Sequence, residues 1–188
     1  MIEQREMTKR IDRICRRADA ICRNIADGVE QYRTIREIYE RRGRMKMEEL
    51  YPVFSDFYRL RGVFDAEALK AMIAARKMLA IETAIERLAR PSYPCVNISF
   101  ASKVLHTIDN DLPIFDRHVG NFFGCGVTGK GWDARLRSAL RIYGGLKEMY
   151  RDREKNGLIR LAEAFSARFG DDFSEVKKVD FMIWGAGR

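Results

Sequence analysis

The chain has 188 residues, of which 46% are hydrophobic, 33% are charged and only 4 are proline. This length fits one domain with a core of its own, and the composition excludes a collagen-like chain and a globally disordered one. Lysine and arginine total 35 against 27 acidic residues, which gives a net charge of +8. The sequence has no apolar run long enough for a membrane span and no secretory signal at its charged N-terminus. We therefore expect a cytoplasmic protein with no membrane partner and with reduced cysteines.

The N-terminal half of the chain is predicted to be helical. Apolar residues recur every three or four positions in four segments, which are residues 2–25, 29–42, 48–60 and 66–89. Gly28, Gly43 and Gly62 are expected to end the first three helices. Asp65 is a favourable N-cap for the fourth helix. Because residues 66–89 are apolar over more than one face, we expect one long helix there at the centre of the core.

The C-terminal half shows the same pattern after a connector that Pro91 and Pro94 make rigid. Further helices are predicted over residues 99–108, 116–123, 133–155, 158–169 and 174–183. The glycine-rich segment 124–132 is expected to be a surface loop, because it lacks the spacing and the preceding strand of a phosphate-binding loop. We therefore predict a single all-α domain over residues 1–188 with eight to nine helices. N-terminal helices would occupy residues 1–90. The segment that contains the candidate site residues would occupy residues 95–124, and C-terminal helices would occupy residues 130–188.

The basic charge favours one class of partner without defining a site. Arginines occur in local groups, among them Arg16 with Arg17 and Arg135 with Arg137. Guanidinium groups suit phosphate oxygens, and a basic domain is typical of proteins that bind nucleic acid. An ordinary basic surface would give the same net charge. A common face for these four arginines would favour a nucleic-acid partner.

The cysteines and histidines predict no metal site. Cys15 and Cys22 lie one heptad apart and are expected to be small core residues. A mixed zinc set could be drawn only from residues far apart in the sequence, with a spacing that matches no zinc module. That set consists of Cys95, His106, His118 and Cys125.

Polar side chains form a stripe along the predicted helix 99–108. Ser99, Ser102, Lys103 and His106 follow one another at steps of one, three or four residues, opposite an apolar face. Such a stripe indicates either the lining of a cleft or a face exposed to solvent. Asp116 precedes the next predicted helix and is expected to be its N-cap.

Two short motifs in this region resemble the active-site segment of the helix-hairpin-helix DNA glycosylase superfamily. Ala101-Ser102-Lys103 is similar to its lysine step, and residues 113–119, with Asp116 and His118, are similar to its aspartate step. The resemblance covers about residues 97–123 and is closest to proteins with the 8-oxoguanine DNA glycosylase fold. It implies that fold, double-stranded DNA with a damaged base as partner, and no cofactor.

The resemblance also implies roles for individual residues. Lys103 would be the amine nucleophile, and Asp116 would stabilise the sugar cation. A basic neighbour such as Arg117 or His106 would help burial to lower the pKa of Lys103. The hairpin that precedes the lysine lacks its glycines, because residues 96–100 read VNISF. The hairpin is therefore degenerate, and its backbone contact with a DNA phosphate would be weaker or made differently.

The remaining candidate residues would bind the base or the DNA. They are Ser102, His106, Arg117, His118, Lys130, Trp132 and Trp184, with Phe122, Phe123 and Phe181 as further rings against which a base could stack. The function expected from the resemblance is that of a DNA glycosylase and abasic-site lyase acting on a damaged, for example oxidised, base. The alternatives are a nucleic-acid-binding protein of the same fold without catalysis, and a structural helical protein.

Overall fold

The described part of the chain consists of α-helices joined by loops. A computed structural model describes residues 3–41, 45–60, 64–90 and 95–188. These residues contain α1 (Gln4–Arg16), α2 (Ala18–Glu40), α3 (Met47–Phe57), α4 (Ala66–Ala75), α5 (Ile81–Leu88), α6 (Ile98–Ile108), α7 (Arg117–Phe123), α8 (Trp132–Arg151), α9 (Ile159–Phe169) and α10 (Glu175–Ala186). The predicted all-α class is confirmed, with ten helices in the described residues instead of eight or nine. None of these helices is long and apolar enough to cross a membrane.

Side-chain caps explain several helix starts. The carboxylates of Asp65 and Asp116 accept hydrogen bonds from backbone N–H groups at the starts of α4 and α7, and the Ser174 hydroxyl does the same for α10. The glycine-rich segment forms the predicted loop before α8. The helix ends expected at Gly43, Gly62, Pro91 and Pro94 lie outside the described residues.

The prediction that Gly28 ends the first helix is wrong. The chain turns earlier, at Arg17, and Gly28 lies inside the 23-residue helix α2. A Cβ atom added to Gly28 would lie 3.0 Å from the ring of Trp184 on α10. The missing side chain of this glycine therefore allows α2 and α10 to approach closely, and the glycine does not end a helix.

The prediction of one long core helix over residues 66–89 is also wrong. Arg76 adopts a left-handed conformation with φ of 51° and ends α4, and α5 begins only at Ile81. The Arg76 guanidinium donates a hydrogen bond to the carbonyl of Tyr39 and lies 4.7 Å from the centre of its ring. These tertiary contacts with the end of α2 stabilise the end of α4 at Arg76, which helix propensity alone does not predict.

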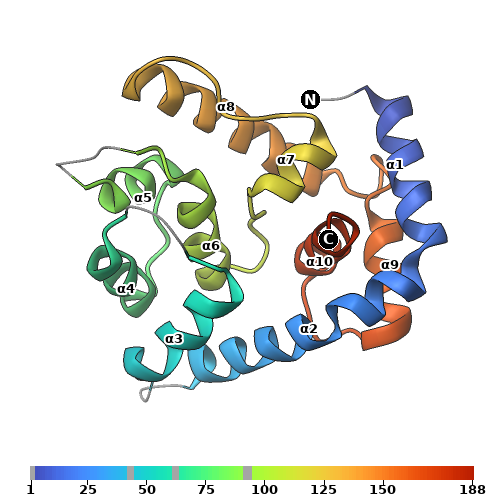
Figure 1. The fold of residues 1–188 in the computed structure, drawn as a ribbon, viewed down its shortest axis with the longest axis horizontal. Helices are drawn as coiled ribbons and strands as arrows, with labels where there is room; N and C mark the ends of the chain where they lie inside the picture. Colours follow the sequence, from blue (N-terminus) through green and yellow to red (C-terminus); the bar gives the residue numbers. More distant parts are fainter. Residues whose placement is uncertain (1–2, 42–44, 61–63, 91–94) are drawn as a thin grey trace.

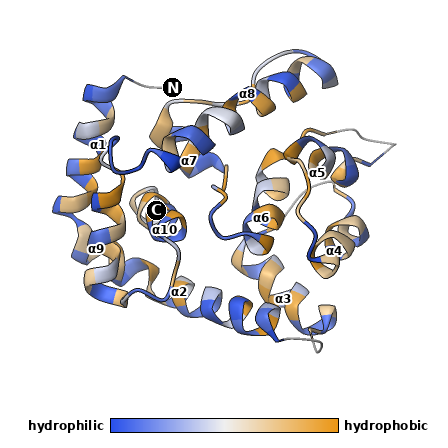
Figure 2. Ribbon diagram, turned by 180° about the vertical axis from the view of Figure 1, so that it is seen from behind, coloured by the Kyte–Doolittle hydropathy of each residue, from blue (hydrophilic) through white to orange (hydrophobic). Residues whose placement is uncertain are grey.

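The helices form two groups that share α2 (Figure 1). Helices α3 to α6 lie on one side, and α1, α9 and α10 lie on the other, with α7 between them. The helix α2 packs against α3 at one end and against α9 and α10 along its length. Figure 2 shows hydrophobic and hydrophilic residues along the whole of α2, as expected for a helix with one buried face.

The centre of the core is α10, not the segment 66–89. Residues 176–183 of this helix are buried on all sides, including three charged side chains. A Cβ atom on Gly185 would lie only 2.6 Å from a methyl carbon of Ile25 on α2, so the two helices cross closely. The arrangement leaves α10 facing α6 and the start of α7, where a cavity lies between these elements.

Candidate functional site

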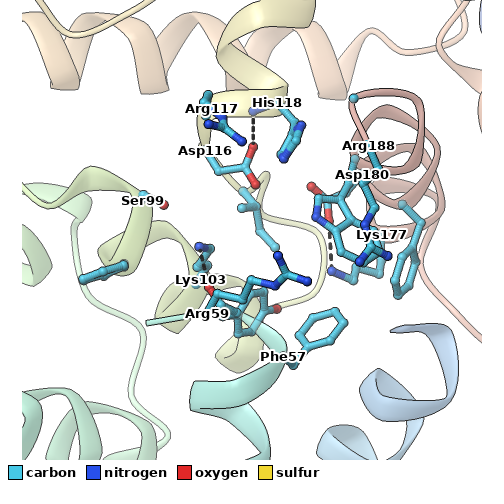
Figure 3. Close-up of a pocket in the computed structure, with 16 residues that line it drawn as sticks. Phe57, Arg59, Ser99, Lys103, Asp116, Arg117, His118, Lys177, Asp180 and Arg188 are labelled. Carbon is cyan, nitrogen blue, oxygen red and sulfur yellow. Dashed lines mark hydrogen bonds and ion pairs between the residues drawn. The ribbon is translucent and has the colours of Figure 1, made fainter. Parts of the chain in front are cut away.

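A cavity of about 800 Å³ lies between α6, α10, the end of α3 and the start of α7 (Figure 3). Its volume is in the range of binding sites for small molecules. Seven charged side chains contribute to its lining, and these are Arg59, Lys103, Asp116, Arg117, Lys177, Asp180 and Arg188. The rings of Phe57, Tyr58, Phe100, Phe181 and Trp184 also line it. The cavity thus combines opposite charges with aromatic surfaces.

Lys103 is the buried amine of this cavity. It lies on α6, is 7% exposed, and donates a hydrogen bond from Nζ to the carbonyl of Tyr58 at 3.3 Å. The ammonium also lies 5.4 Å from the centre of the Tyr58 ring. Burial lowers the pKa of Lys103, and the nearby charge of Lys177 acts in the same direction. The carboxylates of Asp116 and Asp180 act in the opposite direction on this pKa.

Asp116 is fixed at the cavity by the cap that it forms. Its Oδ1 atom accepts hydrogen bonds from the backbone N–H groups of His118 at 2.8 Å and Val119 at 3.0 Å. The predicted N-cap is thereby confirmed. In Figure 3 the carboxylate points from the start of α7 toward the hollow that Lys103 enters from α6. The cap therefore gives Asp116 a fixed direction within the cavity.

Ser102 explains how Lys103 and Asp116 reach the same cavity although only twelve residues separate them in the sequence. Its buried hydroxyl accepts a hydrogen bond from the backbone N–H of Phe115 at 3.0 Å and donates one to the carbonyl of Ser99 at 3.1 Å. These bonds tie the segment before Asp116 to the middle of α6. Ser102 is thus a positioning residue and does not itself line the cavity.

A second pair of charges faces Lys103 from α10. The Nζ atom of Lys177 lies 2.9 Å from Oδ2 of Asp180, and both side chains are almost fully buried. Burial raises the pKa of Asp180, while Lys177 opposes this change. Sequence analysis missed both residues, because charged side chains three apart on a helix are typical of an exposed face. The apolar residues on every side of them, in VKKVDFMI, were the available signal.

Three arginines surround the cavity. Arg59 follows α3 in a left-handed conformation with φ of 48°, which is uncommon for a residue other than glycine. Arg188 lies 4.4 Å from the centre of the Trp184 ring. Arg59, Arg117 and Arg188 form no ion pair with any carboxylate in the described ranges. Their charges are therefore available to an anionic group of a ligand.

The other predicted site residues are divided between the cavity and the rest of the fold. Arg117, His118 and Trp184 line the cavity, as does Phe181. At the rim, α10 and α7 approach closely, since a Cβ atom on Gly187 would lie 2.2 Å from Nδ1 of His118.

His106, Lys130 and Trp132 lie elsewhere. His106 is buried away from the cavity and bonds to the Tyr32 hydroxyl at 3.1 Å and the Leu112 carbonyl at 2.6 Å. Burial holds the pKa of His106 well below its usual range. Lys130 is exposed in the loop before α8, and the half-buried Trp132 begins that helix. The expectation that Arg117 or His106 lowers the pKa of Lys103 is replaced by the role of burial and Lys177.

Three further sets of predicted residues also lie outside the cavity. Phe122 and Phe123 are buried in the core. The exposed arginines 16, 17, 135 and 137 lie on or beside three different helices, α1, α2 and α8. All four cysteines are free. Among the described residues, no group of three or more histidine, cysteine or acidic side chains is arranged to hold a metal ion.

Comparison of the chain with protein-family models, curated proteins and solved structures found no match. The fold and the cavity define an all-α protein with a buried lysine and a capped aspartate in one charged hollow. What this site can do chemically is therefore inferred from the residues that line it.

Proposed function

We propose that the chain binds double-stranded DNA and removes a damaged base, with Lys103 as the nucleophile and Asp116 as the carboxylate beside it. The observation that carries this proposal is the buried Lys103 amine in an open cavity that it shares with a fixed carboxylate. Burial lowers the pKa of Lys103, so more of the amine is unprotonated near neutral pH than in an exposed lysine. A neutral lysine amine is the form that attacks an electrophilic carbon.

The reaction follows from these two groups. The lone pair of Lys103 Nζ forms a bond to C1′ of the sugar while the bond from C1′ to the base breaks and its electron pair leaves with the base. The base gains one proton and the lysine nitrogen releases one. The bond from C1′ to the ring oxygen O4′ then breaks, the second proton of Nζ passes to O4′, and an imine forms between Nζ and C1′. The negative charge of Asp116 stabilises the positive charge that develops on the sugar during bond breaking.

The remaining lining suits an extruded nucleotide. Enzymes that act on a base take it out of the helical stack into a pocket, and the cavity volume of about 800 Å³ accommodates a base with its sugar. Phe57 and Trp184 offer aromatic surfaces for stacking. Arg59, Arg117 and Arg188 offer guanidinium groups to the flanking phosphates. These arginines supply a phosphate contact that the glycine-poor segment before Lys103 lacks.

Borohydride trapping tests the proposal directly. The protein is mixed with a labelled DNA duplex that contains an abasic site, and borohydride then reduces any imine to a stable amine. We expect a covalent adduct with the wild type and with Lys155→Met, a control at an exposed lysine after α8, but none with Lys103→Met. Circular dichroism verifies that both variants are folded. An adduct that persists in Lys103→Met, or a wild type that forms none, would overturn the proposal.

The same samples distinguish a protein that binds nucleic acid without chemistry. Such a protein binds the duplex with an affinity that falls steeply with salt, forms no adduct, and binds equally well as Lys103→Met. The three arginines without ion pairs are the observation that favours this second candidate. A structural protein would show neither the adduct nor salt-dependent binding.

A further inference from the structure

The ion pair between Lys177 and Asp180 has no part in the bond-breaking step, yet it occupies a wall of the same cavity. Its two residues are three apart on α10, so the pair joins no two elements of the fold. Burying two charges costs several kcal/mol per ion, and a cross-link between helices is not there to offset it. Buried ionisable groups in a cavity are candidates for a functional role on this physical ground.

Four aromatic rings lie near the ammonium. The Nζ atom of Lys177 lies 4.3 Å from the centre of the Tyr32 ring, 4.5 Å from Phe181, 5.4 Å from Phe57 and 5.6 Å from Tyr58. Rings accept a cation at their faces but offer no lone pair as strong as that of an oxygen. Figure 3 shows Lys177 and Asp180 side by side at the hollow, opposite Lys103.

Together the two side chains present one donor and one acceptor to anything that occupies the cavity. An ammonium has three N–H groups, and only one of those on Lys177 is directed to Asp180. No hydrogen bond from a described residue reaches Oδ1 of Asp180, so that oxygen has capacity to accept one. Phe57 and Trp184 line the same space and can stack on a planar ring.

We propose that Lys177 and Asp180 bind the hydrogen-bonding edge of the base in the cavity. Lys177 donates to a carbonyl oxygen of the base, and Asp180 accepts from the ring N–H beside that carbonyl. The substrate class is therefore a base with this edge intact, such as an oxidised or deaminated base, and not a base whose edge is blocked by alkylation. This inference rests on the proposed function, because it needs a base in the cavity.

The test compares duplexes that differ only in one base. Three of them contain 8-oxoguanine, hypoxanthine or uracil, each with a carbonyl beside a ring N–H, and a fourth contains ethenoadenine, whose added ring blocks the edge. We expect the wild type to excise at least one of the first three at least about 10-fold faster than ethenoadenine, since two hydrogen bonds to a base edge give about 10- to 100-fold discrimination. Equal or faster excision of ethenoadenine would overturn the inference.

A double variant removes the pair without leaving a lone buried charge. Lys177→Met combined with Asp180→Leu keeps side chains of similar size and removes one charge of each sign near Lys103. We expect it to lose at least about 10-fold in excision of the preferred base, while it still forms the borohydride adduct on the abasic duplex, which has no base to bind. The matched control is Lys178→Met with Asp171→Asn, which removes an ion pair outside the cavity between α10 and the segment before it.

The two substrates separate failure of the inference from failure of the proposed function. A wild type that traps the abasic duplex but excises none of the three bases contradicts the inference alone. Excision that is equally fast in the double variant and in the control also contradicts it. A wild type without an abasic adduct contradicts the proposed function, and the inference with it. Because the wild-type comparison needs no variant, the inference stays testable even where the double variant does not fold.

Discussion

Substitution of one member of the Lys177–Asp180 ion pair should cost far more stability than substitution of both members. Lys177→Met leaves the carboxylate of Asp180 buried without its partner, because that side chain is only 8% exposed. Removal of one member of a buried ion pair typically costs about 3–5 kcal/mol, whereas replacement of both members by apolar groups is often neutral or stabilising. We therefore expect Lys177→Met to lose about 3–5 kcal/mol, and the variant with Asp180→Leu in addition to stay within about 1 kcal/mol of the wild type.

The contacts of the ammonium with aromatic rings also contribute to the stability change of Lys177→Met. Lys177 lies within 4.5 Å of the ring centres of Tyr32 and Phe181, and a desolvated cation at a ring face contributes about 2 kcal/mol. Methionine keeps contact with both rings through its polarisable sulfur, which contributes about 0.3–1.5 kcal/mol. The loss of the cation is thus partly offset, and the unpaired carboxylate dominates the cost.

The pH dependence of the single variant gives a second check. Burial raises the pKa of Asp180 above its unfolded value, and loss of Lys177 removes the main opposing influence. At a pH between the unfolded and the folded pKa, the folded state binds more protons than the unfolded state, so stability rises as pH falls. The deficit of Lys177→Met should therefore shrink from about pH 7 to about pH 5. Urea unfolding followed by circular dichroism measures both effects. A double variant as destabilised as the single one would refute the reasoning, because the pair would then support the fold.

Three further predictions concern packing, the cap and the amine. Gly185→Ala should destabilise the protein by about 1–3 kcal/mol, because its Cβ would lie 2.6 Å and 2.7 Å from methyl carbons of two α2 isoleucines. Gly144→Ala, with nothing within 4 Å, should stabilise it by about 0.5–1 kcal/mol in the same urea titration. Asp116→Asn should keep the cap and change stability by less than about 0.5 kcal/mol, while the rate of base excision falls by about 10²–10³-fold; an unchanged excision rate would remove Asp116 from the mechanism. Burial lowers the pKa of Lys103, so wild-type adduct formation should rise with pH and reach half its maximum below about pH 10.4; a midpoint at or above that value contradicts the assignment.

Local sequence patterns predicted most helices, since spacing and caps act within a few residues. The N-cap Asp116 and the start of α10 at Ser174 are examples. The predictions failed where a distant element decides the local structure. Gly28 lies inside α2 and packs against Trp184, and Arg76 ends α4 where it contacts Tyr39. These partners lie far away in the sequence, so no local pattern contains them.

The candidate site was predictable only in part, because some of its residues are close together in the sequence and others are far apart. Lys103 and Asp116 belong to one short segment, and their residue types suit nucleophilic chemistry. Lys177 and Asp180 belong to another part of the chain, and their burial depends on packing of α10 against several helices. The residue type alone does not show whether a charged side chain is buried or exposed. Only the fold distinguishes Lys177, which lines the cavity, from Lys178, which does not.

The helix α2 joins the two groups of helices and contacts the lining of the cavity. It is about 35 Å long, and it packs against α3 and α10, which both contribute residues to the lining of the cavity. Gly28 is the one glycine within this helix. The ring of Trp184 covers Gly28 from one side and faces the cavity on the other. Through Trp184, the lining of the cavity is thus in direct contact with the middle of α2, the helix that both groups of helices share.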